Sequence, residues 1–385
     1  MVRRRPRTRA DPRRRGCSRV PEGHRHRQDR RGIRPARGER TRPRTRSRPR
    51  HHPARFCAPR GGGSHREEAR HGPRRQITTQ RWHVTVSQTP SIPFSSVEAL
   101  ATLLETCEAA GLAGQDARLL RLGENALFVL PAEQVVVRIA RSVEVLDDVR
   151  KEVAVSAWLN ESGIPAARTT AHEQPLIVRG HPVTLWHLIP GSGSPATLDD
   201  LAGVLRELHG LAVPADLGLP AMNILSRVSE RINAAAVLTE EDRDFLLTRR
   251  RELQTAYDAL AFPLTPCAVH GDAHNENLIK TADGSVLLID FERFAFGPPE
   301  TDLAVTAIEH SVGWGTRAEY DRFAERYGFD VLAWEGYPVL RDINELKMTT
   351  WLMQNVSENE AIAQEFRNRM HSLRNPDMPR RWRAF

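Results

Sequence analysis

Three polar residues in the second half of the chain have the types and the spacing of a site that handles phosphate. Asp272 and Asn277 lie five residues apart in HGDAHNEN, and Asp290 ends the apolar run VLLID eighteen residues after the first. A carboxamide oxygen and a carboxylate aimed at one point suit Mg²⁺, which takes its remaining ligands from water and substrate phosphates. A further carboxylate nearby can orient and deprotonate a hydroxyl that attacks a γ-phosphate. The three residues therefore predict phosphoryl transfer.

A predicted hairpin brings these residues together. Two short apolar strands, LIK and VLLID, flank Asp283-Gly284, and folding them back places Asn277 and Asp290 at the mouth with Asp272 beside them. The alternative is that these Asp and Asn residues serve only as turn residues, since HGD alone is compatible with a tight turn. Three matching positions favour the catalytic site.

The chain before the hairpin predicts a small lobe made mainly of strands. We expect a helix over residues 95–111, opened by a capping box of Ser95 and Glu98. The expected apolar face of this helix consists of Val97, Leu100, Leu103 and Leu104. The expected strands lie at residues 117–123, 125–131 and 134–140, with two more within 168–188, and a helix is expected at 145–163.

A stretch rich in Pro, Gly and Ser at residues 190–195 is the clearest linker of the chain. Beyond it the pattern predicts amphipathic helices, at residues 197–211 and within 224–260 and 317–372, interrupted by the hairpin. The expected fold class is α+β, with a small antiparallel β lobe, a hinge and a larger, mainly helical lobe.

Residues 1–81 differ in composition from the rest of the chain. They contain 28 Arg, no Lys and six acidic residues, a net charge of +22, whereas residues 82–385 contain 28 basic and 42 acidic residues, a net charge of −14. Few aliphatic residues and no apolar period leave this segment unable to bury a core. We expect residues 1–85 to be a disordered Arg- and Pro-rich tail.

Two interpretations of this tail stay open. An Arg-rich arm can bind nucleic acid or an anionic membrane through phosphates. We favour the second interpretation, in which the tail is not translated natively, because Arg-rich and Lys-free sequence is what GC-rich DNA yields ahead of a true start. Val84 or Val86 is then the candidate start, and no nucleic-acid partner is expected. N-terminal sequencing of the native protein decides between the two.

Hydropathy and cysteine content suggest where the protein acts. No apolar run reaches the ~18 residues that cross a bilayer, and the N-terminus lacks the apolar core of a secretion signal. Four cysteines occur without a CxxC pair, so neither a zinc site nor a disulfide framework is expected. We expect a cytoplasmic protein without a membrane partner.

These motifs resemble the aminoglycoside phosphotransferase family, which shares a protein-kinase-like fold with choline kinases and related small-molecule kinases. HGDAHNEN is similar to the catalytic loop of the family, LLIDFE to its metal-binding segment and FGPPETDLA to the segment that follows. The resemblance covers residues 95–370 and implies a bilobal, protein-kinase-like fold. It implies a nucleotide-binding lobe at residues 91–190 and a catalytic, acceptor-binding lobe at 191–375. Ordinary protein kinases are disfavoured, because HGD and DFE replace HRD and DFG.

The resemblance also implies roles for the residues of the hairpin. Asp272 is expected to be the catalytic base, and Asn277 and Asp290 are expected to bind Mg²⁺. Asp302 is expected to brace the catalytic loop from outside it. His270 is expected to pack and to hydrogen-bond rather than to act as acid or base. The same loop contains His274, for which contact with a phosphate stays open.

The nucleotide, ATP or GTP, is expected to bind to the small lobe. Arg138 occupies the position where kinases place a phosphate-holding Lys, and Glu152 matches its helix partner. An Arg can hold two phosphate oxygens, so nucleotide binding is expected to survive this change. The alternative is an exposed strand Arg paired with Glu152 for packing alone. The loop expected to cover the phosphates is Gly123, Glu124 and Asn125. The residues expected to contact the base are Trp186, His187 and Leu188.

The acceptor is expected to bind between the catalytic loop and the C-terminal helices. Residues 301–365 contain twelve acidic and five basic residues, and three tryptophans lie among them. An acidic, aromatic surface favours a cationic acceptor, such as an aminoglycoside or a choline-like amine. The alternative is the ordinary charge of helix surfaces. The candidate acceptor-binding residues are Glu309, Glu345 and Glu358.

Three functions follow from these expectations. The favoured one is a Mg²⁺-dependent small-molecule kinase that transfers the γ-phosphate of ATP or GTP to a hydroxyl, as in aminoglycoside resistance. The second is a housekeeping kinase of choline, an amino alcohol or a sugar, with the same residues in the same roles. The third is a kinase-like binding protein without catalysis, which the intact Asp272, Asn277 and Asp290 disfavour.

Overall fold

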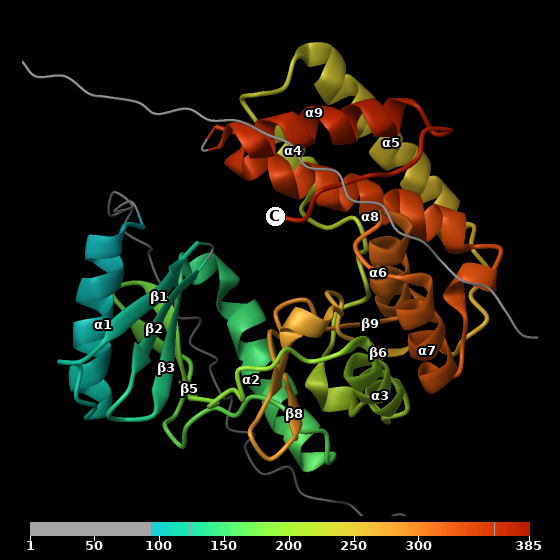
Figure 1. Ribbon diagram of the computed structural model, residues 1–385. Helices are drawn as coiled ribbons and strands as arrows, with labels where there is room; N and C mark the ends of the chain where they lie inside the picture. Colours follow the sequence, from blue (N-terminus) through green and yellow to red (C-terminus); the bar gives the residue numbers. More distant parts are fainter. Residues whose placement is uncertain (1–93, 124, 358) are drawn as a thin grey trace, which may run out of the picture. The chain divides into compact units, whose positions relative to one another are not determined.

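The first part of the described chain forms a five-stranded antiparallel sheet with two helices, and a mainly helical region follows it (Figure 1). The computed structural model describes residues 94–123, 125–357 and 359–385, which belong to one unit, Thr85–Phe385. The tail predicted at residues 1–85 lies outside the described residues.

The strands of the sheet have the order β1-β2-β3-β5-β4, and each neighbouring pair is antiparallel. They are β1 (Arg118–Leu122), β2 (Asn125–Leu130), β3 (Val135–Ala140), β4 (Leu176–Val178) and β5 (His181–His187). Side chains alternate between the two faces of a strand, and Val137 and Ile139 of β3 are fully buried on the same face. The predicted antiparallel meander is confirmed.

Helix α1 (Ser96–Ala110) covers one face of the sheet through Ala99, Leu103 and Cys107, which are spaced four residues apart. The predicted apolar face was therefore only partly right. Leu103 is buried, but Val97, Leu100 and Leu104 are exposed.

The N-terminus of α1 explains the difference. The Oγ of Ser95 accepts a hydrogen bond from the N–H of Glu98 at 3.3 Å, as predicted. The carboxylate of Glu98 does not complete the capping box, because it binds Arg179 at 2.8 Å and 3.1 Å instead. This ion pair, together with the buried hydroxyl of Thr102 bonded to the carbonyl of Glu98, lets polar residues occupy the inner side of the helix.

Helix α2 (Leu146–Glu161) lies on the other side of the sheet from α1 (Figure 1). Its buried Val155 and Leu159 join the same core as Trp186 of β5. This packing holds Glu152, which is 3% exposed, against the sheet. The helix predicted at residues 145–163 is confirmed.

The second part of the chain is mainly helical, as predicted. Its helices are α3 (Leu198–His209), α4 (Val228–Ala234), α5 (Glu240–Asp258), α6 (Glu300–Ser311), α7 (Arg317–Tyr327), α8 (Tyr337–Leu352) and α9 (Glu360–Arg374). Two short ladders lie among them: β6 (Cys267–Val269) pairs with β9 (Ala295–Gly297), and β7 (Leu278–Lys280) pairs with β8 (Val286–Leu288). The β7–β8 ladder is the predicted hairpin, and the α+β fold class is confirmed.

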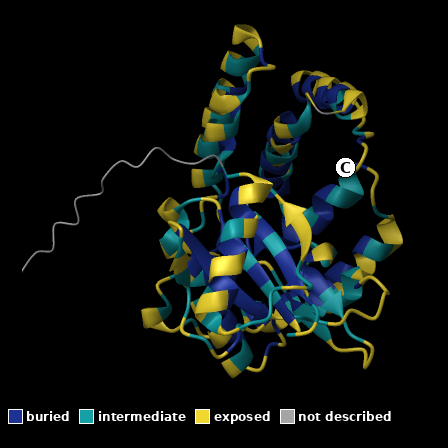
Figure 2. Ribbon diagram, turned by 90° about the vertical axis from the view of Figure 1, so that its left-hand side faces the viewer, coloured by how far each residue is buried: buried dark blue, intermediate teal, exposed yellow. Residues whose placement is uncertain are grey.

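Buried residues occupy β2, β3 and β5 and the inner sides of the helices, while β1 and the outer sides of the helices are exposed (Figure 2). In α3 the buried stripe is Leu201, Leu205 and Leu208, with exposure of 1% or less. In the described part of the chain, no helix is long and apolar enough to cross a membrane.

Two adjacent leucines test the orientation of α1. Leu103 is 0% exposed and Leu104 is 53% exposed. We expect Leu103→Ala to lower the free energy of unfolding by about 2–5 kcal/mol, because it leaves a cavity against the sheet. The matched control Leu104→Ala should change it by no more than about 0.5 kcal/mol. Urea denaturation measures both, and equal losses would contradict this orientation.

Candidate functional site

The loop that carries Asp272 is held by a buried carboxylate from α6. Asp302 is 0% exposed and accepts hydrogen bonds from the backbone N–H groups of His270 at 2.7 Å and Gly271 at 2.8 Å. A third hydrogen bond comes from Nε2 of His209 at 3.1 Å. Burial opposes ionisation, but the hydrogen bond and charge of His209 and the N–H of His270 lower the pKa of Asp302. This arrangement matches the bracing role expected of Asp302.

His270 is a packing residue, as expected. Its ring is 0% exposed and lies edge-to-face against Phe294, with centroids 5.2 Å apart. Its Nε2 bonds to the carbonyl of Ile289 at 3.0 Å, which ties the loop to the end of the hairpin. The buried Nδ1 has no hydrogen-bond partner among the described residues, and no group of the loop reaches it.

The residue after His270, Gly271, must be glycine for two independent reasons. Gly271 has a φ of +78°, which side chains rarely adopt, and a Cβ there would lie 2.4 Å from the carbonyl oxygen of Arg293. The catalytic loop and the segment after Asp290 therefore touch backbone to backbone. This contact places Nε of Arg293 3.7 Å from Oδ2 of Asp272.

The structure brings Asp272, Asn277 and Asp290 together. Nδ2 of Asn277 donates to the backbone carbonyl of Asp272 at 2.9 Å, and it lies 3.1 Å from Nε2 of His274. The N–H of Ile289 donates to the carbonyl of Asn277 at 3.0 Å. Asp290 is the residue after Ile289 and therefore lies close to Asn277. Asp290 has a φ of +63°, a strained conformation that is typical of functional sites in non-glycine residues.

The donors at this point fit a magnesium ion. Because Nδ2 of Asn277 is used within the loop, its amide oxygen faces away from that bond, and the carboxylate of Asp290 is exposed. Both are hard oxygen donors, which Mg²⁺ prefers. Among the described residues, no group of three or more His, Cys, Asp and Glu side chains could hold a metal.

Arg138 of β3 is half-buried in a charged network. Its Nη1 pairs with Glu152 of α2, and its Nη2 lies 3.1 Å from Glu292. With its amide oxygen turned toward Arg138, Asn125 accepts hydrogen bonds from Nε at 3.2 Å and from Nη2 at 2.9 Å. Burial raises the pKa of Glu152 to about 7 against the attraction of Arg138, and Glu292 and Asp290 raise it further. Arg138 is thus less exposed than the alternative interpretation expected, but it does pair with Glu152 as that interpretation expected.

Glu292 connects the sheet to the helical region. Besides Arg138, its carboxylate pairs with Arg227, which precedes α4 and has a φ of +63°. Its backbone carbonyl accepts a hydrogen bond from Nζ of Lys151 of α2 at 2.7 Å. We did not predict the position of Arg227 from the sequence, because nothing local in its neighbourhood indicates a partner 65 residues away.

The other residues predicted to bind nucleotide lie at the two ends of the strands around Arg138, because Asn125 pairs with Ala140 at one end of β3 and His187 pairs with Val135 at the other. The N–H of Gly123 donates to the carbonyl of Asn125 at 3.0 Å in the turn between β1 and β2. Glu124, between them, lies outside the described residues. Trp186 is buried, and its ring centroid lies 6.0 Å from that of Phe291, next to Asp290.

The two residues after Trp186 have their backbone N–H groups engaged. The N–H of His187 donates to the carbonyl of Arg168 at 2.9 Å, and that of Leu188 donates to the carbonyl of Gln134 at 2.8 Å. A base placed here would therefore need other groups, such as carbonyls, for its hydrogen bonds.

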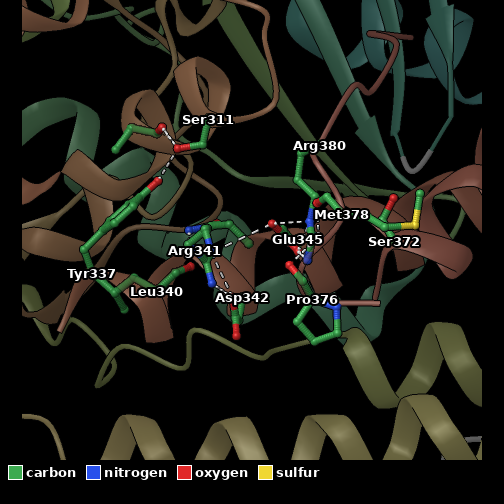
Figure 3. Close-up of polar contacts among 12 residues, drawn as sticks. Ser311, Tyr337, Leu340, Arg341, Asp342, Glu345, Ser372, Pro376, Met378 and Arg380 are labelled. Carbon is green, nitrogen blue, oxygen red and sulfur yellow. Dashed lines mark hydrogen bonds and ion pairs between the residues drawn. The ribbon is translucent and has the colours of Figure 1, made fainter. Parts of the chain in front are cut away.

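The two predicted acceptor-binding acids that the structure describes differ in their surroundings. Glu345 is 1% exposed and binds Arg380 of the C-terminal segment at 2.9 Å and 3.0 Å, with Arg341 on its other side (Figure 3). It holds the C-terminal segment on α8 and is not available to an acceptor. Glu309 of α6 is partly exposed and interacts with Glu276 of the catalytic loop. Glu358 lies outside the described residues.

A model of the phosphotransferase enzyme family, APH, matches residues 114–343. The chain belongs to this family. No curated protein matches the chain. The family resemblance, including the small-molecule phosphotransferase activity that it implies, is confirmed.

Solved structures share the fold. Amicoumacin kinase hAmiN, in complex with AMP-PNP, Ca²⁺ and Ami, has a TM-score of 0.59 and 13% identity, covering 74% of this chain and 98% of that one. The GDP and kanamycin complex of APH(2")-IIia has a TM-score of 0.53 and 16% identity, covering 72% and 99%. The GDP complex of wild-type aminoglycoside 2'-phosphotransferase-IIIa has a TM-score of 0.50 and 17% identity, covering 74% and 100%. The expected protein-kinase-like fold is confirmed.

Two glycines with positive φ test the close contact behind Asp272. A Cβ at Gly271 would collide with the carbonyl of Arg293, whereas a Cβ at Gly284 would meet nothing within 4 Å. We expect Gly284→Ala to cost about 1–2 kcal/mol through its backbone alone, and Gly271→Ala to cost about 2–5 kcal/mol. Denaturant unfolding measures both. A loss at Gly271 no larger than that at Gly284 would mean that the two backbones do not touch.

Glu309 predicts a pH dependence of stability. Burial, with the like charge of Glu276, raises the pKa of Glu309 from 4.5 to about 7. A carboxyl group with a raised pKa stabilises the fold below pH 4.5. This contribution to the free energy of unfolding is lost as the pH rises toward 7, by up to about 3 kcal/mol. We expect the wild type to lose stability over this range relative to Glu309→Gln, and Glu276→Gln to reduce the loss. Parallel wild-type and Glu309→Gln curves of unfolding free energy against pH would contradict the shift.

Proposed function

We propose that this phosphotransferase transfers the γ-phosphoryl group of ATP or GTP to a hydroxyl of a small molecule, with Mg²⁺ as cofactor. The observation that carries the proposal is the convergence of Asp272, Asn277 and Asp290 on one braced loop. Residues 91–190 are the proposed nucleotide-binding lobe, and residues 191–375 are the proposed catalytic and acceptor-binding lobe.

The donor is proposed to bind on the sheet beside Arg138 of the central strand β3. A guanidinium already oriented by Glu152, Glu292 and Asn125 is ready to hold phosphate oxygens in a fork. The turn of Gly123, Glu124 and Asn125 is proposed to cover the phosphates. Trp186, His187 and Leu188 are proposed to line the base. The packing of Trp186 on Phe291 supports this, because it joins the base region to the metal-binding segment.

Asn277 and Asp290 would hold the magnesium ion, which when bound offsets the negative charge of the triphosphate. Asp272 is proposed to accept the proton of the acceptor hydroxyl. Its side chain is 43% exposed, so a hydroxyl can reach it. Asp302 and Gly271 fix the backbone behind it, which limits the orientations that the carboxylate can take.

A cationic group of the acceptor is proposed to bind beside the catalytic loop, at Glu276 and Glu309. Two interacting carboxylates with no ion pair to any described residue would gain from an ammonium group. An aminoglycoside or another amine-bearing antibiotic fits this description, and so does an amino alcohol of metabolism. We propose that the reaction occurs in the cytoplasm, where nucleoside triphosphates are available.

Substitutions at Asp272 and Asp290 should distinguish catalysis from nucleotide binding. We expect Asp272→Ala to lower the transfer rate by about 10²–10⁴-fold while leaving nucleotide affinity nearly unchanged, because it removes only the base. Asp290→Ala should weaken Mg²⁺-nucleotide binding as well. Release of ADP or GDP is measured with a panel of aminoglycosides, other cationic antibiotics, choline, ethanolamine and sugars. An Asp272→Ala variant that turned over at the wild-type rate would refute the assignment.

A further inference from the structure

His274 lies in the catalytic loop, between the proposed base Asp272 and the proposed metal ligand Asn277. Its N–H donates to the carbonyl of Asp272 at 3.1 Å, and its carbonyl accepts the N–H of Asn277 at 3.0 Å. Residues 275–277 form one short 3₁₀ turn, in which side chains three residues apart lie over each other. The ring of His274 therefore lies against the amide of Asn277, with Nε2 3.1 Å from Nδ2.

The second contact of this amide decides which of the two nitrogens donates. Nδ2 of Asn277 also lies 2.9 Å from the backbone carbonyl oxygen of Asp272, which can only accept a hydrogen bond. The amide nitrogen, and not the amide oxygen, must face that carbonyl. Because Nδ2 is only a donor, Nε2 of His274 must be the acceptor, and these hydrogen bonds assign the ring proton to Nδ1.

The two hydrogen bonds together orient the amide of Asn277. Both hydrogens of Nδ2 are used, one on Asp272 and one on His274, which leaves Oδ1 for a ligand. Asn277 is 7% exposed, so an N–H without an acceptor would be costly there. With Asp272 as its one remaining partner, the amide plane would be free to turn about that bond. The ring of His274 thus holds the amide in the orientation that presents its oxygen.

A contact between His274 and a phosphate, which the sequence left open, fits this geometry less well. Nε2 carries no hydrogen in the assigned tautomer and is occupied by Asn277, so it offers nothing to a phosphate oxygen. Charge-assisted hydrogen bonds to phosphate need a cationic donor, and a ring that accepts at Nε2 is neutral. The contacts of the ring therefore favour a role through Asn277.

We propose that His274 is a positioning residue for the metal: it accepts a hydrogen bond from Nδ2 of Asn277 and thereby keeps Oδ1 available to the magnesium ion. The inference rests on the proposed function, in which Asn277 and Asp290 hold that ion. Groups that orient a metal ligand in this way typically contribute about 10–100-fold to metal affinity.

Nucleotide binding with and without the metal tests this role without turnover. AMP-PNP and GMP-PNP are each titrated calorimetrically into the full chain, once with Mg²⁺ and once with EDTA, and the analogue that the wild type binds more tightly is used for the variants. We expect His274→Leu to weaken binding about 10–100-fold with Mg²⁺ and to leave binding in EDTA within about 3-fold of the wild type. An equal loss in EDTA would indicate a direct phosphate contact and would overturn the proposal.

Two further variants separate positioning from a general loss of structure. The side-chain oxygen of a glutamine can accept in place of Nε2, so His274→Gln should retain the effect of Mg²⁺ within about 3-fold. Asn275 of the same loop provides the matched control, because its Nδ2 donates to the carbonyl of Ala196 at 3.0 Å and does not contact Asn277. Asn275→Leu should also retain the effect of Mg²⁺. A loss as large as that of His274→Leu would mean that the loop has simply lost its structure.

A double-mutant cycle tests whether His274 acts through Asn277. Once Asn277→Ala has removed the ligand, adding His274→Leu should cause no further loss of Mg²⁺-dependent affinity beyond about 2-fold. Additive losses would show that His274 acts independently of Asn277 and would overturn the proposal.

The same variants separate this inference from the proposed function. If Mg²⁺ strengthens nucleotide binding to the wild type and to His274→Leu alike, while an acceptor is phosphorylated, the positioning role fails and the proposed function stands. If His274→Leu loses the effect of Mg²⁺ but the wild type phosphorylates no acceptor, the proposed transfer fails and the positioning role stands.

Discussion

The site depends on one buried carboxylate that fixes the backbone of the catalytic loop. Asp302 arises from α6, outside the loop, and receives the N–H groups of His270 and Gly271. A buried charge is tolerated only when it is hydrogen-bonded, and here the partners are the two residues that precede Asp272. The carboxylate of Asp272, the proposed base, thus projects from a backbone that Asp302 holds through two hydrogen bonds. On the other side of the same turn, Gly271 has a left-handed conformation, and its backbone lies in close contact with the backbone of Arg293.

A second constraint joins the two lobes by charge. Glu292 follows the metal-binding segment and holds Arg138 from the sheet and Arg227 from the helical region. Arg138 is also held by Glu152, so the proposed phosphate-binding guanidinium is oriented before any phosphate arrives. Because Asp290 lies two residues before Glu292, one short segment positions both the proposed metal ligand and Arg138.

The sequence predicted the parts of the site that are local. Asp272, Asn277 and Asp290 lie on one hairpin of 19 residues, so their spacing alone indicates that they converge. The sequence failed where contacts are distant. Leu104 matches the helical period but is exposed, because α1 packs on the sheet through Ala99, Leu103 and Cys107.

The direct test of the central claim, that Asp272 delivers the γ-phosphoryl group to a hydroxyl, is ³¹P NMR of a turnover mixture. The enzyme is incubated with Mg²⁺, ATP or GTP and the acceptor panel, with Asp272→Ala in parallel. We predict that the γ-phosphate signal is replaced, one for one, by nucleoside diphosphate and a new phosphomonoester that is absent with the variant. Inorganic phosphate as the sole product, or a phosphomonoester formed equally by Asp272→Ala, would contradict the claim.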